Sequence, residues 1–162
     1  MDSADKMLSL AALPAWRETL RASGRRLVVT NGVFDLLHTG HVTYLEGARG
    51  LGDALLIGVN GDDSVRQLKG PSRPLNPEAD RARVLAGLGC VDATCIFPEM
   101  RAVNFLSVAR PDIYVKGGDY TLDTVNQDER RLIEEGGGKI VLLAHVPGKS
   151  TTAVLQKVNA PK

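Results

Sequence analysis

Two histidines separated by two residues mark the part of this chain where chemistry is most strongly indicated. His38 and His41 belong to the run TNGVFDLLHTGH, residues 30–41. Before it, residues 27–30 read as a buried parallel strand, and after it apolar residues recur at helical spacing. At such a strand-to-helix junction, backbone N–H groups and the positive end of the helix dipole favour an anion, and Gly40 allows a phosphate to approach closely. Two imidazoles add hydrogen-bond donors, so the sequence predicts a nucleoside triphosphate site.

Three other segments carry polar groups where loops meet strands or helices. Lys69 precedes a glycine and two prolines, which predicts a loop; it is either a positive charge that swings over the phosphates or a solvated surface lysine. Residues 116–120, KGGDY, follow a predicted strand, and Asp119 would accept a hydrogen bond from a ribose or sugar hydroxyl or else form a turn. Residues 150–152, STT, open the last predicted helix and either offer donors to phosphates or form an ordinary helix cap.

The pattern GxFDxxHxGH at residues 32–41 resembles the signature of the cytidylyltransferase-like nucleotidyltransferase superfamily. Members of that superfamily transfer a nucleoside monophosphate from a triphosphate to a phosphate-bearing acceptor. The segments KGPSRP at 69–74, VKGGDY at 115–120 and STT at 150–152 are similar, in the same order, to those of the heptose 1-phosphate adenylyltransferases. The resemblance covers residues 27–158. Several ordered motifs make a specific signal, whereas HxGH alone would be weak.

The resemblance implies a role for each matching position. His38 and His41 would engage the nucleotide phosphates in the transition state, with Lys69 as a third catalytic group. A helix cap or a metal pair are the alternatives for the histidines, and three histidines in the chain are a poor ligand supply for zinc. The implied nucleotide-binding residues are Asn31, Gly32, Val33, Phe34, Gly40, Arg81, Lys116, Gly117, Asp119, Ser150, Thr151 and Thr152. The implied cofactor is Mg²⁺, held mainly by the phosphates rather than by protein ligands.

Two acids are candidates for binding the acceptor. Asp35 and Asp62 both follow predicted strands, and carboxylates accept hydrogen bonds from a polyol; each could instead cap a helix. In relatives, the matching positions lie near the acceptor. A sugar phosphate is already an anionic nucleophile, so attack on the α-phosphorus of ATP requires positive charge more than it requires a general base.

The sequence therefore predicts an adenylyltransferase that joins ATP to D-glycero-β-D-manno-heptose 1-phosphate, giving ADP-heptose and pyrophosphate for the lipopolysaccharide core. The identity of the sugar is implied by the resemblance alone. The cytidylyltransferase pattern carries an arginine before its Ser-Thr-Thr, whereas residues 145–149 here read HVPGK, and Lys149 could partly replace that charge. A glycerol 3-phosphate cytidylyltransferase and a nucleotide-sensing or scaffold protein remain as alternatives.

Composition agrees with a compact enzyme domain acting on small molecules. The 20 lysines and arginines balance 19 acids, so no global charge favours nucleic acid or membrane as a partner. No apolar run approaches membrane-spanning length and no signal peptide is apparent, which predicts a cytoplasmic protein. Cys90 and Cys95 lack the spacing of a redox or zinc pair and are expected to be reduced, mostly buried thiols. The resemblance implies a homo-oligomer, and a separate sugar kinase would make the acceptor.

The elements that must position these residues alternate between strand and helix. An N-terminal helix within residues 1–26 is expected to pack on a nucleotidyltransferase domain at 27–162, in a single domain overall. The predicted strands are 27–30, 54–59, 93–97, 113–115 and 139–144; the predicted helices follow residues 41, 63, 76 (with Asn76 as cap), 102, 124 and 150. About five parallel strands with intervening helices predict a three-layer α/β sandwich with a Rossmann-like, doubly wound sheet. Its ligand crevice should lie beyond the carboxyl ends of the strands.

Overall fold

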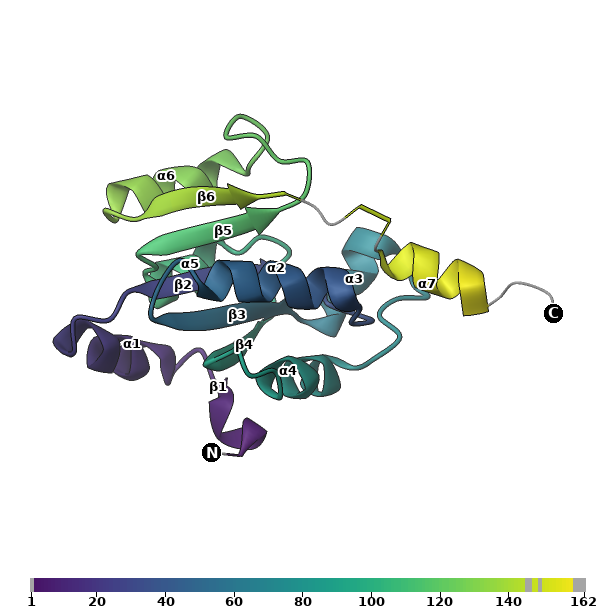
Figure 1. Ribbon diagram of the computed structural model, residues 1–162, viewed down its shortest axis with the longest axis horizontal. Helices are drawn as coiled ribbons and strands as arrows, with labels where there is room; N and C mark the ends of the chain where they lie inside the picture. Colours follow the sequence, from purple (N-terminus) through teal and green to yellow (C-terminus); the bar gives the residue numbers. More distant parts are fainter. Residues whose placement is uncertain (1, 145–146, 149, 159–162) are drawn as a thin grey trace.

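The computed structural model describes residues 2–144, 147–148 and 150–158 of the chain. Within these residues, six parallel strands form one sheet in the order β1-β4-β3-β2-β5-β6 (Figure 1). The strands are β1 (Met7–Leu8), β2 (Leu27–Gly32), β3 (Ala54–Asn60), β4 (Ala93–Phe97), β5 (Ile113–Gly117) and β6 (Lys139–Leu143). The doubly wound parallel sheet is confirmed, with six strands instead of about five. The additional strand, β1, has only two residues, too few to show a periodicity in the sequence.

Helices cover both faces of the sheet, as a three-layer sandwich requires. On β3, Leu56 belongs to the buried cluster that α1, α5 and α6 complete, whereas Leu55 and Ile57 belong to the opposite cluster, completed by α2 and α4. Side chains alternate across a strand, so one apolar run supplies both cores. The helices are a 3₁₀ turn η1 (Ser3–Lys6), α1 (Leu13–Ala22), α2 (Thr39–Arg49), α3 (Asp62–Lys69), α4 (Glu78–Ala86), α5 (Val103–Ala109), α6 (Gln127–Glu135) and α7 (Thr151–Val158).

The strand order creates a switch point between β2 and β5. From β2 the chain proceeds outward to β3 and β4 on one side and later to β5 and β6 on the other. Because the connections that leave β2 and β5 diverge, a crevice opens where these two strands end, at Gly32 and Gly117. The helices α3 and α7 lie at the same end of the sheet (Figure 1).

Three local predictions differ from the structure. Lys69, predicted on a loop, is the last residue of α3, which ends at Gly70 with a φ of 96°. Asn76 was predicted to cap α4, but the cap position is Pro77, because the Asn76 amide donates instead to the carbonyl of Asp35 at 2.8 Å. The strand predicted at 113–115 continues to Gly117, because β6 pairs with it along its whole length.

Two further predictions concern the cysteines and the membrane. Cys90 and Cys95 are free thiols, the first half-buried and the second buried, and burial raises the pKa of Cys95 to about 12. This confirms the prediction for the thiols. No helix in the described part of the chain has both the length and the apolarity of a membrane span.

Candidate active site

A cavity of about 390 Å³ lies at the switch point, where β2 and β5 end. Fourteen of the seventeen residues predicted from the sequence line it. They are Asn31, Gly32, Val33, Phe34, Asp35, His38, Gly40, His41, Lys69, Lys116, Gly117, Ser150, Thr151 and Thr152. Segments that are far apart in the sequence therefore converge on one hollow, and the convergence is produced by the strand order.

The two histidines lie stacked at the start of α2. His38 occupies the N-cap position and His41 lies in the first turn, with ring centroids 3.9 Å apart and an interplanar angle of 26°. The ring of Phe34 meets His41 edge-on, with centroids 5.3 Å apart. Phe34 has a φ of 49°, in the region that few residues other than glycine adopt. A Cβ on Gly32 would lie 2.9 Å from the Phe34 ring, so glycine is required for this ring to fold back toward the histidine.

Lys116 supplies a positive charge from the end of β5. Its ammonium nitrogen donates to Asn31 Oδ1 at 3.1 Å and lies 3.6 Å from Glu129 Oε2, and the side chain is 13% exposed. Burial lowers the pKa of Lys116, while the neighbouring Glu129 carboxylate acts in the opposite direction. The lysine lines the cavity on one side and contacts a buried acid on the other.

Asp35, predicted to bind the acceptor, directs its carboxylate into the protein. The side chain is 3% exposed and accepts hydrogen bonds from Arg73 Nη1 at 2.6 Å and from the backbone N–H groups of Leu75 and Asn76. These bonds tie residues 33–38, the loop between β2 and α2 that is called the histidine loop below, to the segment between α3 and α4. The carboxylate therefore anchors Arg73 at the cavity wall, and the predicted contact with the acceptor is not supported by its geometry.

Arg81 and Asp62 are not brought into the cavity. The side chain of Arg81 is fully buried, and its three nitrogens donate to protein oxygens: the carbonyls of Asn76, Val33 and Asn60, and the carboxylate of Asp62. A guanidinium group with its donors directed at these acceptors supports the histidine loop from behind, through the carbonyl of Val33. These positions do not support the prediction that Arg81 meets the nucleotide phosphates directly and that Asp62 receives the acceptor.

Of the remaining predicted residues, Asp119 lies outside the cavity, whereas Ser150 and Thr151 line it. Asp119 is exposed and does not line the cavity; its neighbours Gly118 and Tyr120 do. Ser150 accepts a hydrogen bond from the N–H of Ala153, so it acts as a helix cap while its residue lines the cavity. The Thr151 hydroxyl is 3.4 Å from the carbonyl of Leu36, which connects α7 to the histidine loop. Lys149, the predicted substitute for the absent arginine, lies outside the described residues.

Arg73 and Tyr44 are among the side chains on the cavity wall that sequence reasoning missed. Arg73 is 16% exposed and stands in the same KGPSRP segment as Lys69, which is the signal that could have indicated it. Tyr44 lies three residues after His41 on α2, a spacing that places both on one helix face. Its hydroxyl contacts Thr30 Oγ1 at 2.7 Å and donates to the carbonyl of Val115, and burial raises its pKa to about 12.

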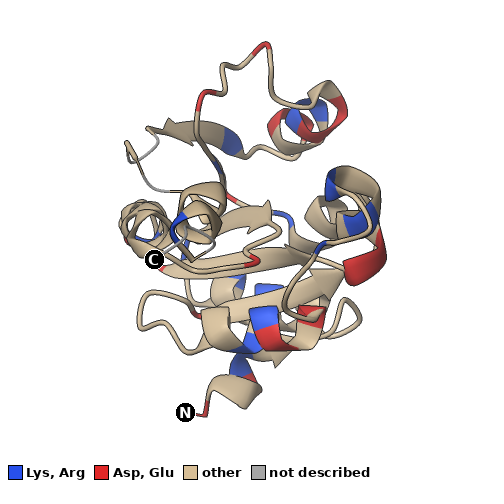
Figure 2. Cartoon of the chain, turned by 90° about the vertical axis from the view of Figure 1, so that its right-hand side faces the viewer, with Lys and Arg blue, Asp and Glu red and all other residues tan. Residues whose placement is uncertain are grey.

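Outside the cavity, the described part of the chain carries charges of both signs. Figure 2 shows lysines and arginines intermixed with acids along the helices. Many of these charged side chains are paired, since the described residues form eleven ion pairs. The positive groups of the cavity, Lys69, Arg73 and Lys116, thus form a local feature suited to a small anionic ligand.

Comparison with known proteins relates the chain to nucleotide-handling proteins. Residues 29–156 match the family described as cytidylyltransferase-like. The chain is 49% identical over 155 residues to the bifunctional protein HldE of Methylobacillus flagellatus, covering 96% of this chain and 31% of that protein. It is 46% identical over 157 residues to the HldE of Trichlorobacter lovleyi, covering 97% and 32%. The chain thus spans about a third of the length of these curated relatives.

Two solved structures share the fold. The lipopolysaccharide core biosynthesis protein from Thermoplasma volcanium has a TM-score of 0.63 and 27% identity, covering 76% of this chain and 98% of that one. The pantoate-beta-alanine ligase from Francisella tularensis, solved with beta-gamma ATP and beta-alanine, has a TM-score of 0.58 and 13% identity, covering 87% and 68%. At that identity the second likeness shows the fold alone.

Proposed function

Because this chain belongs to the cytidylyltransferase-like family, we propose that it transfers AMP from ATP to D-glycero-β-D-manno-heptose 1-phosphate, giving ADP-heptose and pyrophosphate. The observation that carries the proposal is the convergence of the histidine pair, Lys69, Arg73 and Lys116 on one cavity at the switch point of the sheet. A triphosphate and a phosphorylated acceptor together bring many negative charges, and such a site is rich in groups that bind them.

The chemistry follows from charge and placement. The acceptor phosphate oxygen attacks the α-phosphorus of ATP, the bond from that phosphorus to the bridging oxygen breaks, and pyrophosphate leaves with the electron pair. His38 and His41 donate hydrogen bonds from the N-terminus of α2, where the helix dipole also favours the charge moving onto pyrophosphate. Lys69 and Arg73, on the α3 side of the cavity, would neutralise phosphate oxygens and hold the two reactants in line.

The heptose acceptor rests on the resemblance of the four motifs and is supported by the neighbour described as a lipopolysaccharide core biosynthesis protein. A sugar 1-phosphate is the product of a sugar kinase reaction, so such a kinase must supply the substrate. We include in the proposal a cytoplasmic setting, where ATP is abundant, and assembly into a homo-oligomer.

We propose Mg²⁺ as the cofactor, entering as the complex with ATP. Among the described residues no group of three or more histidines, cysteines and acids is arranged to hold a metal. Mg²⁺ prefers hard oxygen ligands, and in the proposed complex phosphate oxygens and water would supply them. When bound, Mg²⁺ would neutralise phosphate charge. The cationic side chains of the cavity would bind the phosphate oxygens that the ion does not contact.

The test is pyrophosphate release in the presence of Mg²⁺, with ATP or CTP crossed against heptose 1-phosphate or glycerol 3-phosphate. We expect release only with ATP and heptose 1-phosphate, and its loss in His41→Ala. Release with CTP and glycerol 3-phosphate would assign the chain to cytidylyl transfer. ATP binding by calorimetry with no release in any combination would indicate a sensing or scaffold protein instead.

A further inference from the structure

A buried acid lies directly behind the cavity wall at the end of β5. Glu129, on the first turn of α6, is 3% exposed and appears in none of the sequence motifs. Its Oε1 accepts the N–H of Ala102 at 3.1 Å, and its Oε2 accepts the hydroxyl of Tyr114 at 2.8 Å. Placing an ionised carboxylate in the interior is costly unless charges and donors surround it, so a specific partner is expected.

That partner is Lys116, whose ammonium nitrogen lies 3.6 Å from Glu129 Oε2. A lysine has three N–H donors. One is directed to Asn31 Oδ1 at 3.1 Å and a second faces Glu129, so these contacts fix the nitrogen from behind. The same nitrogen lies 5.0 Å from the ring centroid of Tyr114 and 5.8 Å from that of Tyr120. The third donor is left for the cavity that Lys116 lines.

We propose that Glu129 is a positioning residue of the nucleotide site that acts through Lys116. Its carboxylate keeps the ammonium group charged and turned toward the cavity, where the lysine binds a phosphate oxygen of the nucleotide. This inference rests on the proposed function, and it adds a residue that touches neither substrate.

The charges around Lys116 determine how the site responds to pH. Burial lowers the pKa of Lys116, Glu129 raises it, and Arg101 lowers it. Burial and the Glu129 charge both raise the pKa of Tyr114, so this phenol stays neutral in the range of interest. Replacing Glu129 by glutamine removes the contribution that raises the lysine pKa. The charged fraction of Lys116 then falls at a lower pH than in the wild type, and phosphate binding weakens with it.

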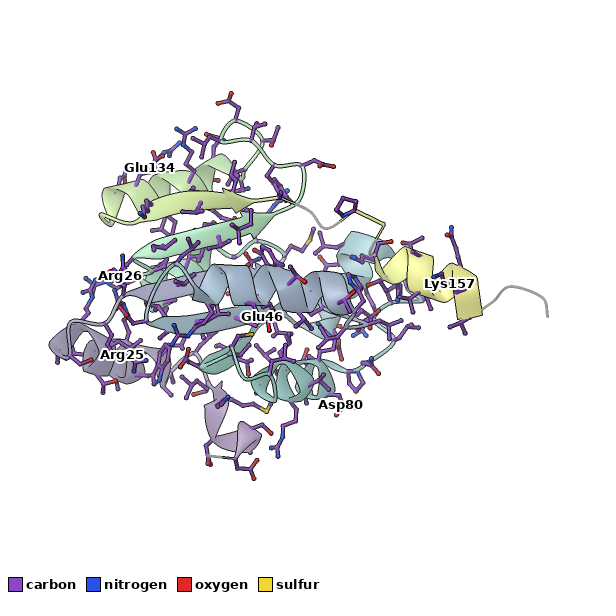
Figure 3. All side chains as sticks on the ribbon, in the orientation of Figure 1. Arg25, Arg26, Glu46, Asp80, Glu134 and Lys157 are labelled. Atoms are coloured by element: carbon purple, nitrogen blue, oxygen red, sulfur yellow. The ribbon has the colours of Figure 1, made fainter. Side chains whose placement is uncertain are left out.

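The experiment is calorimetric titration of the full chain with ATP from about pH 6.5 to about pH 9.5, a range that approaches the ordinary pKa of lysine from below. Glu129→Gln should bind ATP within about twofold of wild type at the low end and about tenfold more weakly at the high end, because Lys116 of the variant loses its charge at a lower pH. Lys116→Arg keeps its charge throughout, so the double variant with Glu129→Gln should recover affinity and lose the pH dependence. Glu134→Gln is the matched control, an exposed acid on the same helix (Figure 3).

Each outcome decides the inference. If Glu129→Gln follows the wild-type pH profile, Glu129 does not act through Lys116 and the proposal is overturned. If Lys116→Arg weakens at the same alkaline pH as the wild type, another group titrates and the proposal is overturned as well; this comparison does not depend on the folding of Glu129→Gln. A wild-type chain that binds no ATP at any pH would remove the proposed function itself, whereas turnover with an unshifted profile would remove only the role of Glu129.

Discussion

Arg81 and Lys116 are two buried cations, predicted alike to bind the nucleotide, yet their surroundings differ. Arg81 stands behind the histidine loop with no side-chain exposure, and each of its three nitrogens donates to a protein oxygen. Lys116 stands at the end of β5 with part of its side chain on the cavity wall and two protein contacts. A cation is available to a ligand when the protein leaves one of its donors unused, and residue type alone does not tell which case applies.

Arg81→Met should have the largest effect and should act on stability. It leaves the carbonyls of Val33 and Asn60 without this donor and uncouples Asp62, so we expect the free energy of unfolding to fall by about 3–5 kcal/mol. Urea denaturation measures this loss. Arg83→Gln is the control on the same helix, because its exposed pair with Asp2 should contribute less than about 1 kcal/mol. Intact stability with lost ATP affinity would show that Arg81 is a ligand after all.

His41→Ala should have the next largest effect and should act on catalysis. Removing one pre-oriented donor from a charge-stabilising site lowers kcat by about 100- to 1000-fold. The ring packs on His38 and on the edge of Phe34 at the cavity wall, so we expect catalysis to lose more than folding does. Steady-state pyrophosphate release and urea denaturation, measured together, separate the two effects. Thr43→Ala, exposed on the same helix, should leave both unchanged. A loss of stability that accounts for the lost activity would contradict a catalytic role.

The contrast between the two cations also shows what could be predicted from the sequence. The central strands were predictable because each contains a short run of apolar residues, and their alternation with helices predicts that they are parallel. The strand β1 was not predictable, because its two residues pair with Thr94 and Cys95, more than eighty positions away. The cavity residues were predictable because the motifs are contiguous in the sequence.

The roles of individual charged residues were less predictable. The acceptors that occupy Arg81 include the backbone carbonyls of Val33 and Asn60, and a carbonyl is present at every position of a sequence and marks none. Asp35 is similar, since the N–H groups of Leu75 and Asn76 saturate it. Glu129 belongs to none of the sequence motifs, because it lies on α6, behind the cavity wall, and contacts Lys116 from there.

Gly117→Ala tests whether the β5 end of the cavity is packed as tightly as the Arg81 side. A Cβ at Gly117 would lie 2.5 Å from the ring of Tyr44, whose hydroxyl is held by Thr30 and Val115. The ring cannot move without breaking those bonds, so overpacking should cost about 1–3 kcal/mol. The shift in Tm measures the cost. Gly89→Ala is the control, because nothing lies within 4 Å of its Cβ position. Equal shifts in both variants would mean that Tyr44 yields easily.

Lys116→Met should have the smallest effect. In contrast to Arg81→Met, it should lower ATP affinity more clearly than it lowers stability. Methionine is similar to lysine in side-chain length but carries no charge, so ATP affinity should fall about tenfold, equivalent to about 1.4 kcal/mol. Stability should also fall, because the Glu129 carboxylate loses its cation, but by less than in Arg81→Met, because Glu129 keeps the Tyr114 hydroxyl and the N–H of Ala102 as donors. Calorimetry with ATP and urea denaturation give the two numbers. If Lys116→Met instead destabilised the fold as much as Arg81→Met and left ATP binding unchanged, both cations would be structural, and the distinction between a saturated and an available donor would not hold in this protein.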